Sequence, residues 1–360
     1  MSSMLLHPEV QTEKDFLPIS GTDYIEFYVG NARQSAYFYR AAFGMSLVAW
    51  AGPETGLHDR SSYVLQQGEI RFVLTTPLRP SGGIADHIHR HGDGVRDIAM
   101  TVDDAKLAWR ETTRRGARSV HECHELRDEY GRVKVASIAA YGDTIHTFVE
   151  RERYYGPFLP GYEPAPLDSP HDPIARPVGL TRIDHIAANV GWNELHRWID
   201  YYNDILGFSL DLDSTENNLP SETFALNTRV VVGANRRVLF PIHEPAEART
   251  KSPVEEYLEF YHGPGVQHVA LATGNIVETI ERMRTQGVDF MPAPAGYDPF
   301  GHNRRLEANI AGVTQSLPEL ARLGILVHHD QQGCILHAFT RPVEDRPTLF
   351  FEILQRSSGW

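Results

Sequence analysis

The chain has 360 residues and a formal net charge of −13, and 41% of its residues are hydrophobic. This length allows two domains, while the acidic balance argues against nucleic acid as a partner, because phosphate binding requires clustered Lys and Arg. No apolar run approaches membrane-spanning length, and the first twenty residues lack a secretory signal pattern, so we expect no membrane association. Cys123 and Cys334, the two cysteines, are expected to be free thiols in a reducing compartment, which favours the cytoplasm.

After an irregular leader over residues 1–20, the first half predicts a strand, an aromatic-rich helix and further strands. The expected elements are strands at Asp23–Val29, Ser62–Leu65, Ile70–Thr75, Val133–Ala139 and Thr144–Glu150, with helices at Ala36–Phe43 and Ala105–Arg115. Between them, His87-Ile88-His89-Arg90-His91 is interpreted as a solvated loop, because a flexible loop would not fix the geometry of metal ligands. His328-His329-Asp330 and Tyr297-Asp298 are interpreted as turns.

The second half repeats this order of elements. Asp184-His185-Ile186 corresponds to Asp23-Tyr24-Ile25, residues 265–270 correspond to residues 94–99, and residues 350–356 correspond to residues 145–151. A shared order of elements predicts an internal duplication. The segment 155–177, rich in Pro, Gly and Asp, is the expected linker between an N-terminal domain over 21–154 and a C-terminal domain over 178–360.

The two halves differ in residue type at three corresponding positions: His185 for Tyr24, His268 for Asp97 and Glu352 for Thr147. A single histidine in a strand is usually a hydrogen-bonded structural residue. Two imidazoles and one carboxylate, each on an apolar strand, instead favour a metal site, because an ionised carboxylate is not buried without a partner. His185, His268 and Glu352 are therefore predicted to be the metal ligands of a catalytic C-terminal domain, and the N-terminal domain is predicted to hold no metal.

Two histidines and one carboxylate leave coordination positions open, a donor set that suits Fe(II) and O₂ activation. Fe(II) in such a site would bind a chelating 2-oxo acid together with O₂. Zinc remains the alternative, since catalytic zinc also uses this set, although the His-Glu-x-x-His helix of zinc peptidases is missing from the sequence. Neither a Gly-rich phosphate loop nor a Gly-x-Ser-x-Gly motif is found, so nucleotide binding and serine hydrolysis are not expected.

Three longer motifs lie at residues 251–260, 265–271 and 339–352. They resemble the 4-hydroxyphenylpyruvate dioxygenase and 4-hydroxymandelate synthase family, and the resemblance extends from Asp23 to Arg356. It implies an α+β fold of two tandem vicinal-oxygen-chelate domains, each built of paired βαβββ modules that form an open barrel. It also implies an Fe(II) site of His185, His268 and Glu352, with the N-terminal domain having lost its metal.

Five positions match substrate-pocket positions of the family: Thr228, His243, Pro253, His337 and Phe339. The resemblance places His243 where the family has an asparagine, and Pro253 and His337 where it has glutamines. Imidazole and proline differ from amides in hydrogen-bonding capacity and charge. The family also continues beyond the glutamate strand into a helix that closes the pocket, whereas this sequence stops at Trp360, so we expect a more open mouth or another lid.

The expected function is Fe(II)-dependent oxidative decarboxylation of a 2-oxo acid similar to 4-hydroxyphenylpyruvate, with altered selectivity and hydroxylation of the ring or the benzylic carbon. One alternative is an extradiol-type dioxygenase or a metal-dependent lyase of the same fold. Another is a non-enzymatic binding or resistance protein. The expected partners are the small-molecule substrate and O₂, and family analogy is compatible with a homodimer.

Overall fold

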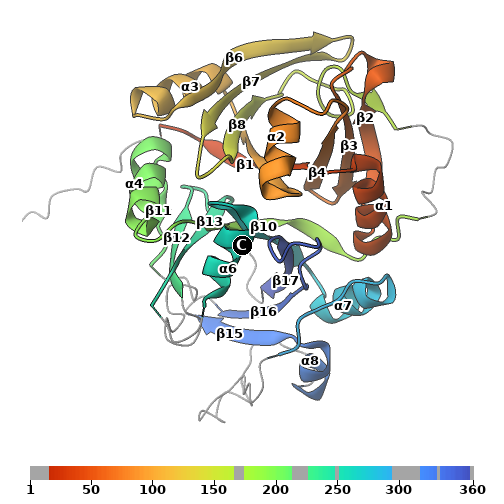
Figure 1. Cartoon of the computed structure of the whole chain (residues 1–360), viewed down its shortest axis with the longest axis vertical. Helices are drawn as coiled ribbons and strands as arrows, with labels where there is room; N and C mark the ends of the chain where they lie inside the picture. The colour runs from red at the N-terminus through yellow and green to blue at the C-terminus, as the bar shows by residue number, and fades with distance from the viewer. Residues whose placement is uncertain are drawn as a thin grey trace, which may run out of the picture.

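The structure is a computed structural model that describes residues 16–165, 174–212, 226–247, 251–293, 317–330 and 333–356. The strands of these residues form two sheets, one in the upper half and one in the lower half of Figure 1. The first sheet contains the strands up to residue 164, and the second begins at residue 180. The two sheets therefore correspond to the two halves of the sequence.

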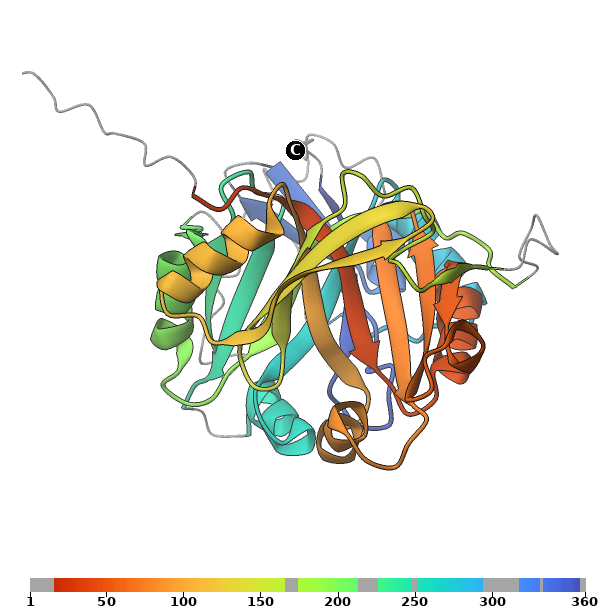
Figure 2. The same ribbon diagram turned by 90° about the horizontal axis from the view of Figure 1, so that it is seen from above.

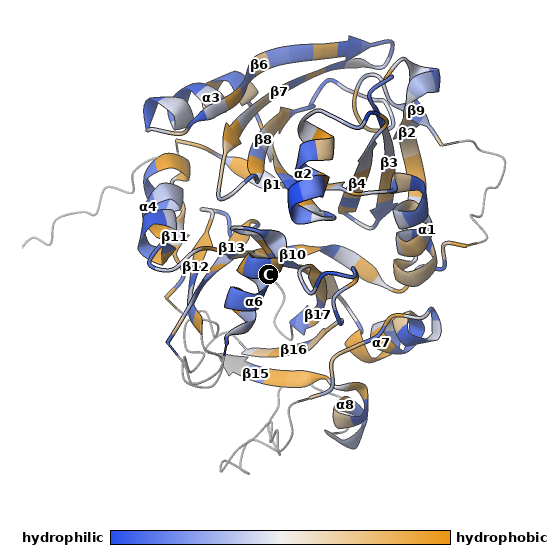
Figure 3. Ribbon diagram, in the orientation of Figure 1, coloured by the Kyte–Doolittle hydropathy of each residue, from blue (hydrophilic) through white to orange (hydrophobic). Residues whose placement is uncertain are grey.

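The first sheet has the strand order β6-β7-β8-β5-β1-β4-β3-β2-β9. Its strands are β1 (Ile19–Tyr28), β2 (Ser46–Ala51), β3 (Arg60–Gln67), β4 (Ile70–Pro77), β5 (Gly94–Val102), β6 (Ser119–Asp128), β7 (Gly131–Ala139), β8 (Ile145–Glu150) and β9 (Glu163–Pro164). The helices of this half are α1 (Ala32–Phe43), η1 (Pro53–Thr55), α2 (Gly83–His91) and α3 (Ala105–Arg114). Strand β6 is largely hydrophilic (Figure 3) and forms an edge, where charged side chains discourage pairing with other chains.

The second sheet has the order β11-β12-β13-β10-β14-β17-β16-β15. Its strands are β10 (Leu180–Asn189), β11 (Ser209–Leu210), β12 (Leu226–Val232), β13 (Leu239–Pro245), β14 (Gly265–Thr273), β15 (Leu326–Asp330), β16 (Gly333–Phe339) and β17 (Phe350–Arg356). Its helices are α4 (Leu195–Leu206), α6 (Pro253–Tyr261), α7 (Ile276–Thr285) and α8 (Leu317–Leu323). No helix in the described part of the chain is long and apolar enough to cross a membrane.

The same strand pairing occurs at the centre of both sheets. Strand β1 runs antiparallel to β5 and parallel to β4, and β5 runs parallel to β8. In the second sheet, β10 runs antiparallel to β14 and parallel to β13, and β14 runs parallel to β17. Each half thus consists of two βαβββ modules whose first strands pair. The strands of both modules form one curved sheet, as the view from above shows (Figure 2). The expected α+β fold of two tandem vicinal-oxygen-chelate domains is confirmed.

Aromatic side chains from both halves share one hydrophobic core. The ring of Phe351 on β17 lies 4.8 Å from the Phe43 ring and 5.8 Å from the Phe72 ring, centroid to centroid. In return, His146 on β8 contacts the second half: its Nε2 lies 2.8 Å from the Tyr202 hydroxyl, and its ring stacks on Phe240. The two domains are therefore joined by reciprocal contacts from corresponding strands.

Two local expectations were wrong. Residues His87 to His91 are not a solvated loop, because they form the second half of helix α2, and His87 and His91 are buried against the C-terminal half. His328 to Asp330 are not a turn, because they end strand β15. The leader and linker also contribute to the fold: β1 already begins at Ile19, and β9 pairs with β2. The predicted turn at Tyr297-Asp298 lies outside the described residues.

Candidate metal centre

Three neighbouring strands of the second sheet bring His185, His268 and Glu352 together. His185 lies on β10, His268 on β14 and Glu352 on β17, and β14 pairs with both other strands. His185 Nε2 is 2.9 Å from Glu352 Oε2 and 3.4 Å from His268 Nε2, and His268 Nε2 is 3.5 Å from Glu352 Oε2. All three side chains are buried.

These separations fit one shared metal ion. Imidazole nitrogens and carboxylate oxygens bind divalent metals at about 2.0–2.2 Å, so neighbouring ligand atoms stand about 3.0 Å apart in octahedral and about 3.4 Å apart in tetrahedral geometry. The three observed distances span this range.

The hydrogen bonds of both imidazoles fix the protonation that metal binding requires. His185 Nδ1 lies 3.1 Å from Asp184 Oδ1, and His268 Nδ1 lies 3.0 Å from Gln267 Oε1. Because these oxygens only accept, each Nδ1 carries the proton and each Nε2 presents a lone pair. Two lone pairs 3.4 Å apart repel each other, and a cation between them removes the repulsion.

Two irregularities in strand pairing place the supporting residues beside the histidines. In the β10–β14 ladder the pairing passes from Ile183 directly to His185, and it also omits Gln267 on β14. In a regular strand, neighbouring side chains point to opposite faces. A β-bulge at Asp184 and another at Gln267 change this direction, so each side chain reaches the histidine that follows it.

Asp184 is itself held by arginine. Arg356 donates to both oxygens of the carboxylate, at 3.1 and 2.7 Å, and Arg182 Nη1 lies 3.2 Å from Oδ2. Burial alone would raise the pKa of Asp184, but hydrogen bonds from His185 and Arg356 keep the pKa well below its usual range. Asp184 therefore stays an anion and orients the His185 ring.

The Glu352 carboxylate has two separate sets of partners. Oε2 faces the two histidines, while Oε1 lies 2.6 Å from His337 Nδ1. Burial would raise its pKa, but the electrostatic effect of nearby His185 and the hydrogen bond from His337 lower the pKa well below the ordinary value. His337 Nε2 is buried and has no hydrogen-bond partner among the described residues.

Three more of the predicted pocket residues lie near this group. His243 Nδ1 is 2.8 Å from the Thr228 hydroxyl, and the His243 ring centroid is 6.2 Å from that of His268. Burial and the neighbouring imidazoles lower the pKa of His243 to about 3, so its ring is neutral at pH 7. Phe339 pairs with Glu352 across β16 and β17, and its ring lies 5.9 Å from His268.

Pro253 has a different position. It is the exposed first residue of helix α6, preceded by the N-cap Ser252, whose hydroxyl accepts from Glu255 N. A proline suits this position, because its fixed φ fits the helix and the missing N–H would have no intrahelical partner. Its expected role in substrate binding stays a prediction.

Sequence reasoning missed three residues that support the group. Phe350 stacks on His268 with centroids 5.0 Å apart, and it pairs directly with His268 across β14 and β17. Its position two residues before Glu352, on the same strand face, was a usable signal. Asp184 and Gln267 gave no such signal, because only the β-bulges turn them toward the histidines.

The corresponding positions of the first domain form a hydrogen-bonded group without histidine. The Thr147 hydroxyl donates to Asp97 Oδ2 at 2.6 Å, and the Tyr24 hydroxyl donates to the same oxygen at 3.4 Å. Tyr24 and Thr147 both pair with Ala99, just as His185 and Glu352 both pair with Ala270. The three substituted positions are therefore equivalent in space as well as in sequence.

Comparison with known proteins agrees with this architecture. The model of the Glyoxalase/Bleomycin resistance protein/Dioxygenase superfamily matches residues 21–132 and 182–302. A solved structure of a triple mutant of 4-hydroxymandelate synthase from Streptomyces coelicolor is similar, with a TM-score of 0.79 and 26% identity, covering 96% of this chain and 94% of that one. The chain belongs to this superfamily of glyoxalase-type folds.

Two curated relatives define the family more closely. The chain is 39% identical to the 4-hydroxyphenylpyruvate dioxygenase of Dictyostelium discoideum, over 94% of this chain and 93% of the relative. It is 38% identical to that of Yarrowia lipolytica, over 93% of this chain and 86% of the relative. The chain is therefore a member of the 4-hydroxyphenylpyruvate dioxygenase family, whose enzymes are non-heme iron dioxygenases of 2-oxo acids, and it is an enzyme, an oxidoreductase of the dioxygenase class.

Proposed function

We propose that this chain is an Fe(II)-dependent dioxygenase that oxidatively decarboxylates a 2-oxo acid similar to 4-hydroxyphenylpyruvate, with His185, His268 and Glu352 as the metal ligands. The proposal depends mainly on one observation: two imidazole lone pairs and a buried carboxylate oxygen converge within 3.5 Å of one another. Fe(II) bound there supplies open coordination positions for a chelating keto acid and for O₂.

The surrounding side chains have separate tasks in this proposal. Asp184 and Gln267 hold each histidine with its Nε2 lone pair toward the metal. His337 occupies the second oxygen of Glu352, which leaves one oxygen for the metal. Phe339 and Phe350 place two aromatic rings beside His268 and limit the access of water to the reacting centre.

The same arrangement supports an altered substrate pocket. His243 and His337 stand beside the ligands, at positions where the resemblance expects amides. A neutral His243, held by Thr228, offers a single donor or acceptor in place of the two kinds of group that an amide presents. We therefore propose selectivity for a 2-oxo acid other than 4-hydroxyphenylpyruvate itself, hydroxylated on the ring or on the benzylic carbon.

The metal chemistry is tested by the variant His268→Ala with Asp97→Asn as its matched control at the equivalent position of the first domain. O₂ uptake and CO₂ release are measured with a panel of aromatic 2-oxo acids, with Fe(II) or with zinc added. We expect activity only with Fe(II), a loss of at least about 10³-fold in His268→Ala because one ligand is removed, and near-normal turnover in Asp97→Asn. Turnover supported by zinc, or O₂ uptake without release of CO₂, would contradict the proposal.

The pocket is tested by the double variant His243→Asn with His337→Gln. Restoring both amides should raise kcat/KM for 4-hydroxyphenylpyruvate about 30-fold, since each of the two recovered hydrogen bonds contributes about 1 kcal/mol. The matched control is His196→Gln on the exposed face of α4. No gain in the double variant, with iron content unchanged, would mean that these two histidines do not set substrate selectivity.

A further inference from the structure

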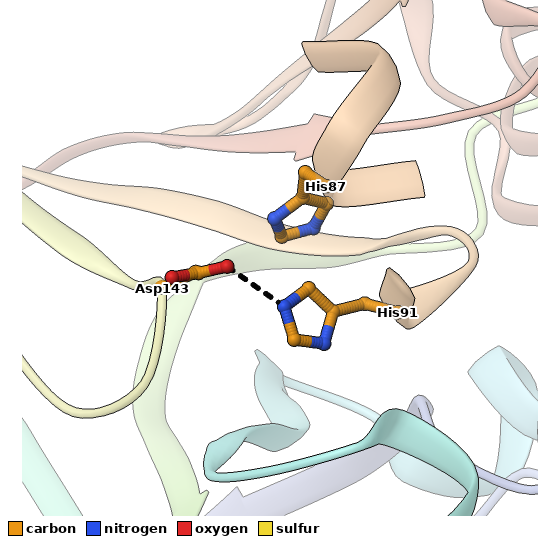
Figure 4. Close-up of side chains that lie close together, drawn as sticks. All are labelled: His87, His91 and Asp143. Atoms are coloured by element: carbon orange, nitrogen blue, oxygen red, sulfur yellow. Dashed lines mark hydrogen bonds and ion pairs between the residues drawn. The ribbon is translucent and has the colours of Figure 1, made fainter. Parts of the chain in front are cut away.

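A second group of metal-ligating side chains lies outside the centre described above. His87 and His91 stand on helix α2, and Asp143 lies in the turn between β7 and β8. One ligand atom of each lies within 4.8 Å of the others. Residues four apart occupy the same helix face, and Figure 4 shows both rings beside the Asp143 carboxylate.

The hydrogen bonds of His91 require a cation at this point. Its Nδ1 bonds to the Tyr261 carbonyl oxygen, which can only accept, so Nδ1 carries the ring proton. Its Nε2 lies 2.9 Å from Asp143 Oδ2, which also only accepts as an ionised carboxylate. A neutral His91 would therefore place two lone pairs against each other. Either a second proton on the ring or a metal ion between the two atoms resolves the conflict.

His87 distinguishes these two solutions. It is 4% exposed, and neither of its ring nitrogens has a hydrogen-bond partner among the described residues. Its ring centroid lies 4.7 Å from that of His91. A buried polar group without a partner is costly, and a second proton on His91 would leave His87 unsatisfied. A metal ion satisfies both histidines at once.

We propose that His87, His91 and Asp143 form a second divalent-metal site, separate from the catalytic centre, with Zn²⁺ as the best-suited ion. Two imidazoles and a carboxylate, completed by water, are a common zinc donor set. Tetrahedral zinc needs ligand atoms about 3.4 Å apart, so the His87 ring rotates slightly to close the site, and no hydrogen bond restrains that rotation. The Asp143 side chain is 38% exposed, which gives the ion a path from solvent.

The position of this site gives the ion a structural task. Helices α2 and α6 lie side by side in both views of the molecule (Figures 1 and 2). His91 stacks on Tyr261 of α6 with ring centroids 4.4 Å apart. An ion at this site would connect α2 to the β7–β8 turn and, through His91, would fix the contact between the two domains.

Arg90 competes with the ion for the Asp143 carboxylate. Arg90 Nη1 donates to Asp143 Oδ2 at 2.8 Å, and Arg96 donates to the Asp143 backbone carbonyl. The Arg90 side chain is 56% exposed and can move away from Asp143 without disturbing the hydrophobic core. Its replacement in Arg90→Gln should therefore tighten zinc binding, because a competing cation is removed from the ligand oxygen.

The test counts zinc ions per chain in metal-free full-length protein titrated with Zn²⁺ alone, by mass spectrometry after gel filtration. The wild type should hold two equivalents, one in each centre. His87→Ala and His268→Ala should each hold one, and the double variant none. His89→Ala is the matched control on the exposed face of α2 and should keep two. This design separates failure of the second site from failure of the catalytic centre.

A second readout keeps the proposal testable if His87→Ala folds poorly. Saturating zinc should raise the Tm of His268→Ala by about 3 °C, and Arg90→Gln should bind zinc at this site about tenfold more tightly. Wild-type zinc that is lost entirely in His268→Ala, a zinc content in His87→Ala equal to that of the wild type, or an unchanged zinc affinity in Arg90→Gln would each overturn the second site.

Discussion

Asp23 and Asp184 are corresponding residues with different neighbours. Both carboxylates are buried, and each accepts two hydrogen bonds from one arginine: Asp23 from Arg151 and Asp184 from Arg356. Only Asp184 is followed by a histidine, whose Nδ1 it accepts from. The aspartate–arginine pair is thus part of both domains, and in the second domain it orients His185, a proposed metal ligand.

At the residue scale, this pair predicts the effect of Asp184→Asn. The amide keeps the size of the side chain but loses the charge that holds the His185 ring, so metal affinity should fall about 10–100-fold. Competition with a chelator measures the metal affinity. Asp23→Asn is the matched control, and it should lose stability to a similar extent without a change in metal affinity. Equal losses of affinity in both variants would show that Asp184 acts only through the fold.

At the scale of elements, strand β5 carries a buried carboxylate, Asp97, at the position where the corresponding strand β14 carries His268. Asp97 is buried, and its Oδ1 has no hydrogen-bond partner within the described ranges. Burial raises the pKa of Asp97 to about 7, while the hydrogen bond from Thr147 opposes this shift. The native state therefore favours the protonated form of Asp97.

This shift makes stability depend on pH in a defined direction. The folded-state pKa is above the unfolded value of about 3.9, so the contribution of Asp97 to stability is complete below pH 4 and is lost as the pH rises through 7. Asp97→Asn should then be more stable than the wild type by about 4 kcal/mol at pH 8, and by only about 1 kcal/mol at pH 4.5. Urea unfolding at both pH values measures this difference, with the exposed Asp103→Asn as control. A difference that does not vary with pH would contradict the assignment.

The sequence predicted the strands of the proposed ligands because their signal is local: apolar strands that each carry one residue of a ligating type, which the structure places close together. The repeat of elements located their counterparts, and with them the fold. Asp184 and Gln267 could not be predicted, because a β-bulge depends on the pairing of two distant strands. The burial of His87 and His91 could not be predicted either, because Tyr261, far along the chain, creates the surface against which α2 packs.

At the scale of the whole molecule, strand β17 connects the metal group to the other domain. Glu352 faces the two histidines, whereas the preceding residue, Phe351, packs against Phe43 and Phe72 of the first domain. The domain contact and one proposed metal ligand therefore share a strand, and we expect the geometry of the site to depend on the packing of the two domains.

Phe351→Ala should lower the free energy of unfolding by about 3–5 kcal/mol, because it leaves a cavity in the shared core. It should also weaken metal binding, because the support of Glu352 is lost. His146→Ala is the matched control, since it removes the reciprocal domain contact from a strand without metal ligands. Calorimetry and metal titration together check the prediction. Unchanged metal affinity in Phe351→Ala would show that β17 holds Glu352 without help from the first domain.

The β-bulges beside the two histidines also occur in the first domain, where the β1–β5 ladder omits Asp23 and Arg96. The first domain thus has the same chain path as the proposed metal centre, with Tyr24, Asp97 and Thr147 at the three corresponding positions. In this duplicated architecture the two groups therefore differ in their side chains while they share the same strand pairing. By the same reasoning, the first domain is a natural host in which an artificial redox centre could be installed next to the existing one.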